Sequence, residues 1–203
     1  MNVCLIRHGE TAWSLTGQHT GVTDLALTAH GEDQARALAP RLQALAFSQV
    51  LVSPRLRAQQ TCTLAGSHAG SVTEPDLAEW DYGDYEGRLT VDIRRDNPGW
   101  DIWRDGCPGG ESPSEVSARA DRLIARLCRM QGTVALFSHG QFSAALAARW
   151  IGLDLVEGQH FALNPASLSL LGIDAKHGNR RMIELWNESR IPPSQLTPSS
   201  AGE

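Results

Sequence analysis

Three short apolar runs, each followed by a segment of helical periodicity, constrain the fold of this chain more than any other feature. The runs are residues 4–6, 50–52 and 133–137, and each is typical of a strand buried on both faces of a sheet. The helical segments that alternate with them are expected at 29–46, at 53–66 and at 141–151. This alternation predicts a single α/β domain with a mostly parallel sheet.

The remaining segments are expected to extend or cover that sheet. Residues 12–27 are expected to form an irregular loop, and 79–110 is irregular with one short helix near 90–97. A longer helix is expected from Pro113, with the apolar stripe Val116, Ala120, Leu123, Ile124 and Leu127. Residues 167–173 and 182–186 predict a hairpin at the sheet edge. The domain is therefore expected over 1–187, followed by a polar, mobile tail over 188–203.

The first strand ends abruptly in a cation, an imidazole and a glycine, at Arg7, His8 and Gly9. Ligands of open α/β sheets bind beyond the carboxyl ends of the strands. The forked donors of Arg match phosphate or carboxylate oxygens, and His can act as nucleophile, base, metal ligand or donor. Gly9 would allow the backbone to approach the ligand closely. Taken alone, the turn is equally compatible with a histidine that only hydrogen-bonds at a strand end.

A second strand ends in the same way, with His139 followed by Gly140. If the two strands are parallel neighbours, their imidazoles meet at one sheet edge. Arg57 lies early in another strand-to-helix connection and would reach that edge, beside the positive end of a helix dipole. This set contains no Asp or Glu as a metal ligand. Two histidines and two arginines fit a phosphoryl group better than zinc.

Composition indicates the compartment and excludes some partners. The chain has 203 residues and a formal net charge of −5, with a pI near 5.8, whereas proteins that bind nucleic acids or anionic membranes normally have a basic face. We expect no leader, because the first strand begins almost at Met1, and no apolar run approaches about 20 residues. The cysteines show no CxxC or zinc-finger spacing; they are Cys4, Cys62, Cys107 and Cys128. We therefore expect a cytoplasmic protein with free thiols.

Four motifs resemble, in order, those of the histidine phosphatase superfamily, also called phosphoglycerate-mutase-like. They are Arg7-His8-Gly9-Glu10-Thr11, Ser53-Pro54-Arg55-Leu56-Arg57-Ala58, Glu79-Trp80-Asp81-Tyr82-Gly83 with Tyr85-Glu86-Gly87, and Ser138-His139-Gly140. The resemblance covers residues 1–187, which is nearly the whole chain. It implies a doubly wound α/β fold with helices on both faces of the sheet.

The resemblance also implies the roles of the site residues. His8 would be the nucleophile and Glu79 the proton donor, and the phosphate clamp would be Arg7, Arg57 and His139. Of the two arginines in the second motif, Arg57 matches the family, and Arg55 is expected at the mouth of the site or on the surface. Further phosphate- or substrate-contacting positions are Ser14, Thr20, Gly21, Tyr82 and Gly140. Arg104 either binds a second phosphate or a sugar hydroxyl, or pairs with a neighbouring aspartate.

The chemistry of phosphate monoesters agrees with these roles. Their negative charge repels nucleophiles, and fixed guanidinium groups offset that charge in the transition state. A phosphohistidine on His8 divides hydrolysis into two easier steps, provided that His8 is unprotonated. Glu79 can protonate the leaving alkoxide and then deprotonate the attacking water. The expected reaction requires no metal and no other cofactor.

Alternatives to hydrolysis remain at this stage. Mutases of the family have a longer insertion between the Tyr-Gly segment and the second histidine. In this chain the interval from Tyr82-Gly83 to His139 is short, which leaves the site more open and favours a phosphatase. A non-catalytic phospho-ligand binding protein would need to have lost His8 or Glu79, and both are present. Residues 14–27, 81–87 and 102–107 resemble sedoheptulose bisphosphatase of this superfamily, which favours a sugar phosphate or bisphosphate as the small phosphorylated metabolite. A homo-oligomer is possible.

Overall fold

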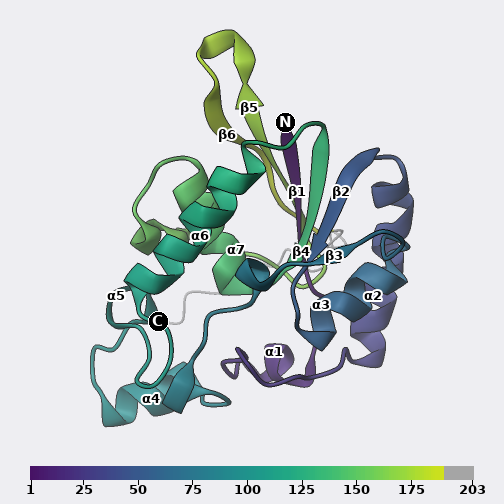
Figure 1. Cartoon of the computed structure of the whole chain (residues 1–203). Helices are drawn as coiled ribbons and strands as arrows, with labels where there is room; N and C mark the ends of the chain where they lie inside the picture. The colour runs from purple at the N-terminus through teal and green to yellow at the C-terminus, as the bar shows by residue number, and fades with distance from the viewer. Residues whose placement is uncertain (190–203) are drawn as a thin grey trace, which may run out of the picture.

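The computed structural model of the protein describes residues 1–189 and contains one six-stranded mixed sheet (Figure 1). The strand order is β3-β2-β4-β1-β5-β6. The first four strands in that order are parallel: β1 (Asn2–Arg7), β2 (Phe47–Val52), β3 (Val72–Thr73) and β4 (Thr133–Ser138). The last two form an antiparallel hairpin, β5 (Leu168–Asp174) and β6 (Arg180–Glu188), in which β5 also pairs antiparallel with β1. The predicted mostly parallel sheet is confirmed.

Helices cover both faces of the sheet (Figure 1). One face carries α2 (Ala29–Gln43) and α3 (Leu56–Leu64), and the other carries α6 (Pro113–Leu127) and α7 (Gly140–Trp150). Short helices complete the described chain: α1 (Ala12–Thr16), α4 (Thr90–Asp96), α5 (Ile102–Asp105) and the 3-10 turns η1 (Pro75–Leu77), η2 (Gly83–Tyr85), η3 (Leu155–His160) and η4 (Ala175–His177). The predicted doubly wound α/β fold is therefore confirmed.

The alternation of side chains along the central strands produces two separate cores. Val3 and Leu5 of β1 pack into the cluster under α6 and α7, whereas Cys4 and Ile6 pack into the cluster under α2 and α3. Both sets are almost completely buried, as expected for a strand covered on two sides. The apolar run of β1 therefore joins both layers and holds the turn at its carboxyl end in place.

The structure contains two short helices that the sequence did not predict, and it begins a third helix later than predicted. The expected loop 12–27 contains α1, because Thr11 and Ser14 form a capping box that starts a short helix without an apolar stripe. α3 begins at Leu56 instead of residue 53, because Ser53 continues the sheet by donating its amide hydrogen to Phe137. A second short helix, α5, lies in the irregular stretch, where the Asp101 side chain caps it.

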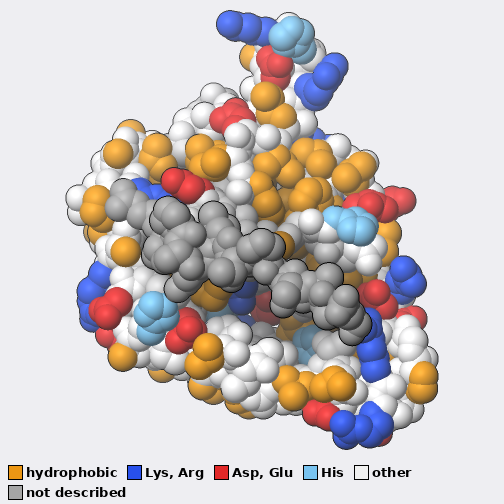
Figure 2. All heavy atoms as spheres, turned by 180° about the vertical axis from the view of Figure 1, so that it is seen from behind, with side chains coloured by type: hydrophobic (Ala, Val, Ile, Leu, Met, Phe, Trp, Pro, Cys, Tyr) orange, Lys and Arg blue, Asp and Glu red, His pale blue; other side chains and the backbone are white. Residues whose placement is uncertain are grey.

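The β5–β6 hairpin forms the sheet edge, as predicted, and its tip projects from the body (Figures 1 and 2). Figure 2 shows charged and histidine side chains gathered at this tip, where Lys176, His177 and Arg180 are exposed. Charged side chains on an edge hinder unwanted pairing with other strands. β6 continues to Glu188, so the structure extends one residue beyond the predicted domain boundary. The rest of the predicted tail, 190–203, lies outside the described residues.

Gly9 packs against the backbone of α2, which is a reason for glycine at this position besides the expected approach to a ligand. A Cβ atom at Gly9 would collide with the Gly31 carbonyl oxygen, and one at Gly31 would collide with the Glu10 carbonyl oxygen. The amide of Gly9 also donates to Thr61 Oγ1 at 3.0 Å. The two glycines therefore allow the turn after β1 to lie directly on the first turn of α2.

Replacing Gly9 by alanine should lower the free energy of unfolding by about 3 kcal/mol, because backbone atoms cannot move aside as a flexible side chain can. Gly172→Ala is a matched control, since the atoms nearest to its new methyl group belong to the flexible side chain of Glu184. We expect the control to change stability by less than about 1 kcal/mol. Urea unfolding followed by tryptophan fluorescence measures both. Equal urea midpoints for Gly9→Ala and wild type would contradict the close packing.

Candidate active site

The carboxyl ends of β1 and β4 bring His8 and His139 together. The strands are parallel neighbours in a register that pairs Arg7 with Ser138, so each histidine follows directly after a paired residue. The centroids of the two imidazole rings are 5.2 Å apart, with an angle of 61° between the ring planes. The structure thus places both imidazoles at one sheet edge, as their position after two buried strands indicated.

The His8 ring is neutral and has a defined tautomer. Its Nδ1 lies 2.7 Å from the carbonyl oxygen of Gly9, and because a carbonyl only accepts, Nδ1 must carry the hydrogen. Nε2 is then the nitrogen with the free electron pair. Burial, followed by the charges of Arg7 and Arg57, holds the pKa of His8 well below its usual value of 6.5. The ring therefore meets the requirement of a nucleophile over the physiological pH range.

Arg57 is completely buried and is held by backbone carbonyl groups. Its terminal nitrogens donate to the carbonyl oxygens of Thr20, Gly21 and Thr23 at 2.9–3.1 Å. Arg7 is held in a similar way, since its Nη1 donates to the carbonyl oxygen of Leu163. These bonds fix both guanidinium groups in place before any ligand arrives, with no carboxylate bonded to either group within the described residues.

Four buried nitrogens of residues near the two imidazoles have no hydrogen-bond partner among the described residues: Arg7 Nε, Arg55 Nε, Arg57 Nε and His139 Nδ1. An unpaired buried donor costs about 1–3 kcal/mol, so such groups usually have a functional reason. Donors next to fixed guanidinium groups suit the oxygens of a phosphoryl group. Within the described residues, no group of three or more His, Cys, Asp or Glu side chains could hold a metal ion.

Ser53 contacts His139 and was not recognised as a site residue from the sequence. Its Oγ lies 2.7 Å from His139 Nε2 and also accepts from the amide of Arg55 at 3.3 Å. If the hydroxyl donates to Nε2, the hydrogen of the neutral ring is on Nδ1, which is the nitrogen without a partner. Burial and then the charge of Arg57 lower the pKa of His139 well below 6.5, so the ring is neutral.

The Glu79 carboxylate lies at the N-terminus of α7. Oε1 accepts from the amides of Phe142 at 2.7 Å and Trp80 at 2.9 Å, and Oε2 accepts from the amide of Gln141 at 3.0 Å. These bonds orient a side chain that is only 7% exposed and lines the same cavity as His8. Glu79 is therefore a positioned acid or base beside the two imidazoles.

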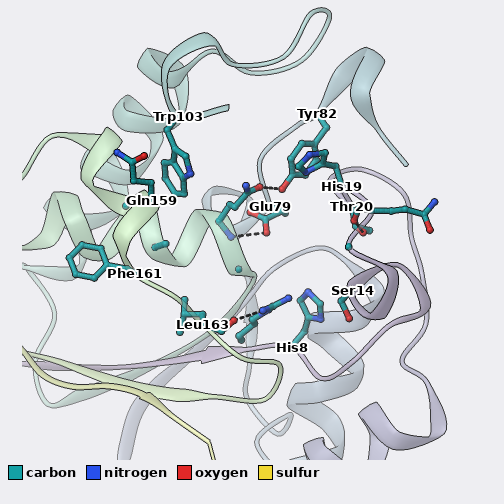
Figure 3. A pocket seen from close by; sticks show the side chains of 17 residues that line it. His8, Ser14, His19, Thr20, Glu79, Tyr82, Trp103, Gln159, Phe161 and Leu163 are labelled. Atoms are coloured by element: carbon teal, nitrogen blue, oxygen red, sulfur yellow. Dashed lines mark hydrogen bonds between the residues drawn. The ribbon is translucent and has the colours of Figure 1, made fainter. Parts of the chain in front are cut away.

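The cavity in front of these residues has a volume of about 380 Å³ (Figure 3). Of the further predicted contact positions, Ser14, Thr20, Tyr82 and Gly140 line it. Gly21 does not line it: its amide donates to the Glu86 carboxylate, and its carbonyl supports Arg57. Arg104 lies exposed on α5 outside the lining, and the neighbouring Trp103 lines the cavity instead. Among the described residues, no carboxylate forms an ion pair with Arg104.

Comparison with known proteins identifies the family. The family model described as histidine phosphatase superfamily (branch 1) matches residues 3–189. The chain belongs to the histidine phosphatase superfamily. It is 45% identical over 185 residues to an acid phosphatase of Mycobacterium tuberculosis, covering 89% of this chain and 90% of the relative. It is 36% identical over 182 residues to sedoheptulose 1,7-bisphosphatase of Saccharomyces cerevisiae, covering 73% of this chain and 67% of that relative.

A solved structure supports the same conclusion. The structure of an open reading frame product from Mycobacterium tuberculosis superposes with a TM-score of 0.85 at 41% identity, covering 93% of this chain and 97% of that one. The expected membership of the superfamily is thereby confirmed, and the relatives named as phosphatases are consistent with the expected hydrolase. None of the helices in residues 1–189 is long and apolar enough to cross a membrane.

His19 is a further cavity residue of this histidine phosphatase that the sequence did not reveal. Its ring stacks on Tyr82 with centroids 4.6 Å apart and meets Trp100 edge-on at 5.6 Å. Burial lowers the pKa of His19 to about 4, although the charge of Glu86 opposes the shift. A single histidine in a polar loop is normally a surface residue. The one sequence feature that pointed to a place in the cavity was the position of His19 directly before Thr20, in a segment that resembles the family.

Acid should destabilise the histidine phosphatase, and His19 should account for part of the effect. Because its pKa is about 4 in the folded protein and 6.5 ordinarily, the unfolded chain binds a proton that the folded protein excludes. The free energy of unfolding should therefore fall as the pH drops from 6.5 toward 4, by up to about 1.4 kcal/mol per pH unit for each such histidine. Burial of His8 and His139 acts in the same direction.

The variant His19→Gln should show a weaker dependence of unfolding free energy on pH than the wild type. Urea unfolding at a series of pH values between 6.5 and 4 measures the two slopes. The slope of unfolding free energy against pH reports the titration of His19. Loss of the stacking of His19 on Tyr82 lowers the unfolding free energy equally at all pH values and does not change this slope. The exposed His30→Gln on α2 is the control and should keep the wild-type slope. Identical slopes for His19→Gln and wild type would rule out a buried neutral His19.

Proposed function

We propose that this phosphatase hydrolyses small phosphate monoesters through a phosphohistidine on His8, with Glu79 as general acid and base. The observation that carries the proposal is the hydrogen bond from His8 Nδ1 to the carbonyl oxygen of Gly9. This bond leaves the electron pair of His8 Nε2 free, among buried donors that have no partner within the described residues. The lowered pKa of His8 supports the same role, because only the neutral ring can attack phosphorus.

In the first step, His8 Nε2 forms a bond to phosphorus while the bond from phosphorus to the ester oxygen breaks. Glu79 enters the cycle as the neutral acid, and the leaving oxygen takes its proton, so the alcohol departs neutral and Glu79 becomes a carboxylate. Arg7 and Arg57 face the nonbridging oxygens with positive charge, and His139 Nδ1 supplies a neutral donor. Because these groups are fixed before the ligand binds, little reorganisation is required during the transfer.

In the second step, water attacks the phosphohistidine. Glu79, now a carboxylate, accepts a proton from the water as the new oxygen–phosphorus bond forms and the nitrogen–phosphorus bond breaks. Inorganic phosphate leaves, and both His8 and Glu79 return to their starting forms. The amides of α7 that hold Glu79 can support both roles, since they fix the position of the carboxyl group.

Within this activity we propose a sugar phosphate or a related small metabolite as the substrate. The likeness to sedoheptulose 1,7-bisphosphatase supports a phosphorylated sugar, and the likeness to an acid phosphatase supports hydrolysis as such. We also keep the proposal of a cytoplasmic protein, which the buried free thiols of Cys4, Cys62 and Cys107 support.

A panel of phosphorylated metabolites, with release of inorganic phosphate as the readout, tests the proposed function. The panel should include sugar monophosphates, sugar bisphosphates and both phosphoglycerates, each with EDTA present. Phosphate release that persists in EDTA is the expected result. Interconversion of 2- and 3-phosphoglycerate without phosphate release would assign a mutase instead. Absence of turnover on every ester, combined with tight binding of one of them, would assign a binding protein.

A further inference from the structure

The cavity has two unlike sides (Figure 3). His8, Ser14, Thr20 and other polar groups lie on one side, around the position of the reacting phosphoryl group. Trp103, Gln159, Phe161 and Leu163 lie on the other side, with Glu79 between the two. Because Glu79 is the proposed donor to the leaving oxygen, the alcohol part of the substrate must extend toward this second side.

The second side is preformed and largely apolar. The Trp103 ring meets Trp80 edge-on at 5.6 Å, and a Cβ atom at Gly158 would collide with it, so ring and backbone are in close contact. Phe161 meets Trp186 with centroids 5.4 Å apart. These contacts hold two aromatic rings at the cavity wall before a ligand binds. The two side chains therefore lose little conformational entropy when the ligand binds.

Formal charge in the cavity is confined to the reacting centre. Of the described residues that line it, only Arg7 and Glu79 carry a charge, because the pKa values of His8 and His19 are lowered by burial. The polar groups on the alcohol side are the amides of Gln141 and Gln159. Gln141 Oε1 already accepts from the Tyr82 hydroxyl, so its NH2 group is the part available to a ligand.

We propose that the substrate is a monophosphate whose alcohol is uncharged and presents a ring face to Trp103 and hydroxyl or amide groups to Gln141 and Gln159. The proposal rests on the proposed function and selects among its substrates: it favours the monophosphate of a cyclic alcohol over a bisphosphate or a phosphorylated acid. A second negative group placed against Trp103 and Phe161 would lose part of its hydration without gaining a cation from this cavity, which is costly. Arg94 lines only the adjoining cavity, which shares Trp103 with this one. A ring face gains apolar contact there.

Two esters that differ chiefly in charge far from phosphorus provide the test: 4-carbamoylphenyl phosphate and 4-carboxyphenyl phosphate. Their leaving phenols also differ slightly in acidity, so the change of the kcat/KM ratio between variants is the measurement that isolates the charge. The amide and the carboxylate have almost the same shape. For the wild type we expect kcat/KM to be at least about tenfold higher for the carbamoyl ester. The exposed Gln159 allows a direct reversal, since Gln159→Lys introduces a cation at the cavity wall and should reduce the ratio to about threefold or less.

Leu153→Lys is the matched control, because it adds the same charge at an exposed position outside the cavity lining. It should keep the wild-type ratio. Equal kcat/KM for the two esters in the wild type, or a preference for the carboxylate, would overturn the proposal while leaving the proposed function intact. Should the wild type prefer the carboxyl ester, the variant Arg94→Gln shows where the carboxylate binds. Loss of that preference in Arg94→Gln would place the carboxylate in the adjoining cavity that Arg94 lines. Absence of hydrolysis of either ester would instead contradict the proposed function.

The ring contact is tested separately with Trp103→Leu. We expect kcat/KM for 4-carbamoylphenyl phosphate to fall about tenfold, and kcat/KM for the acyclic glycerol 1-phosphate to fall much less, because only the first ester has a face to stack on the indole. Equal losses on both esters would show that Trp103 only supports the fold, and would overturn the ring requirement.

Discussion

Replacing His8 by alanine should lower kcat by about 10⁴-fold or more on every substrate. The variant keeps the arginines proposed to hold the phosphoryl group but lacks the nitrogen to which phosphorus is transferred. A loss confined to KM would instead indicate that His8 only binds the substrate. Steady-state phosphate release measures kcat and KM for both proteins.

The expected loss for His8→Ala can be separated from misfolding. The side chain is buried but makes only one hydrogen bond within residues 1–189, to the adjacent Gly9, so the variant should fold and bind inorganic phosphate or vanadate. His30→Ala, an exposed histidine on α2, is the control and should retain wild-type kcat. If His8→Ala retained activity within about tenfold of the wild type, another nucleophile would have to carry the reaction.

Glu79→Gln should have the second largest effect, and its size should depend on the leaving group. The amide cannot donate a proton to an alkoxide, so kcat/KM for an alkyl phosphate should fall by about 10³-fold. p-Nitrophenolate leaves without protonation, and kcat/KM for p-nitrophenyl phosphate should therefore fall by only about tenfold. The comparison isolates the acid role, since kcat/KM reports the steps up to transfer of phosphorus to His8.

The base role of Glu79 has its own signature in the same variant. Water attack becomes slow, so the phosphohistidine should accumulate and p-nitrophenol should appear in a rapid burst of one equivalent. Glu184→Gln, on the exposed surface of β6, is the matched control and should keep kcat/KM within about twofold of the wild type. Equal losses on both esters, with no burst, would assign Glu79 a structural role at the N-terminus of α7.

The sequence predicted the fold well because its strongest signals come from burial on both faces of the sheet. The runs at 4–6 and 133–137 could only be central strands, and their parallel pairing follows from the helices between them. The length of α6 was also predictable, since Pro113 and the capping box of Ser112 and Glu115 mark its start and its apolar stripe is regular.

The site was only partly predictable, because several contacts join segments far apart in the chain. The pairing of Ser53 with His139 spans 86 residues, and the stacking of His19 on Tyr82 depends on the path of an irregular loop. Gly21 and Arg104 are two predicted contact positions that the cavity lining does not include. Alignment with the family placed Gly21 in the phosphate pocket, whereas the local backbone directs its amide to Glu86, and residue type alone could not place Arg104 outside the cavity.

The most direct test of the account is the identification of the phosphorylated atom. The Glu79→Gln variant is mixed with p-nitrophenyl phosphate, quenched in alkali and digested, and the phosphopeptide is sequenced by mass spectrometry. We predict one phosphoryl group per chain on His8, attached at Nε2, stable in base and lost in acid. A phosphoryl group on any other residue, or turnover with no phosphoenzyme at all, would contradict the role of His8 as the nucleophile.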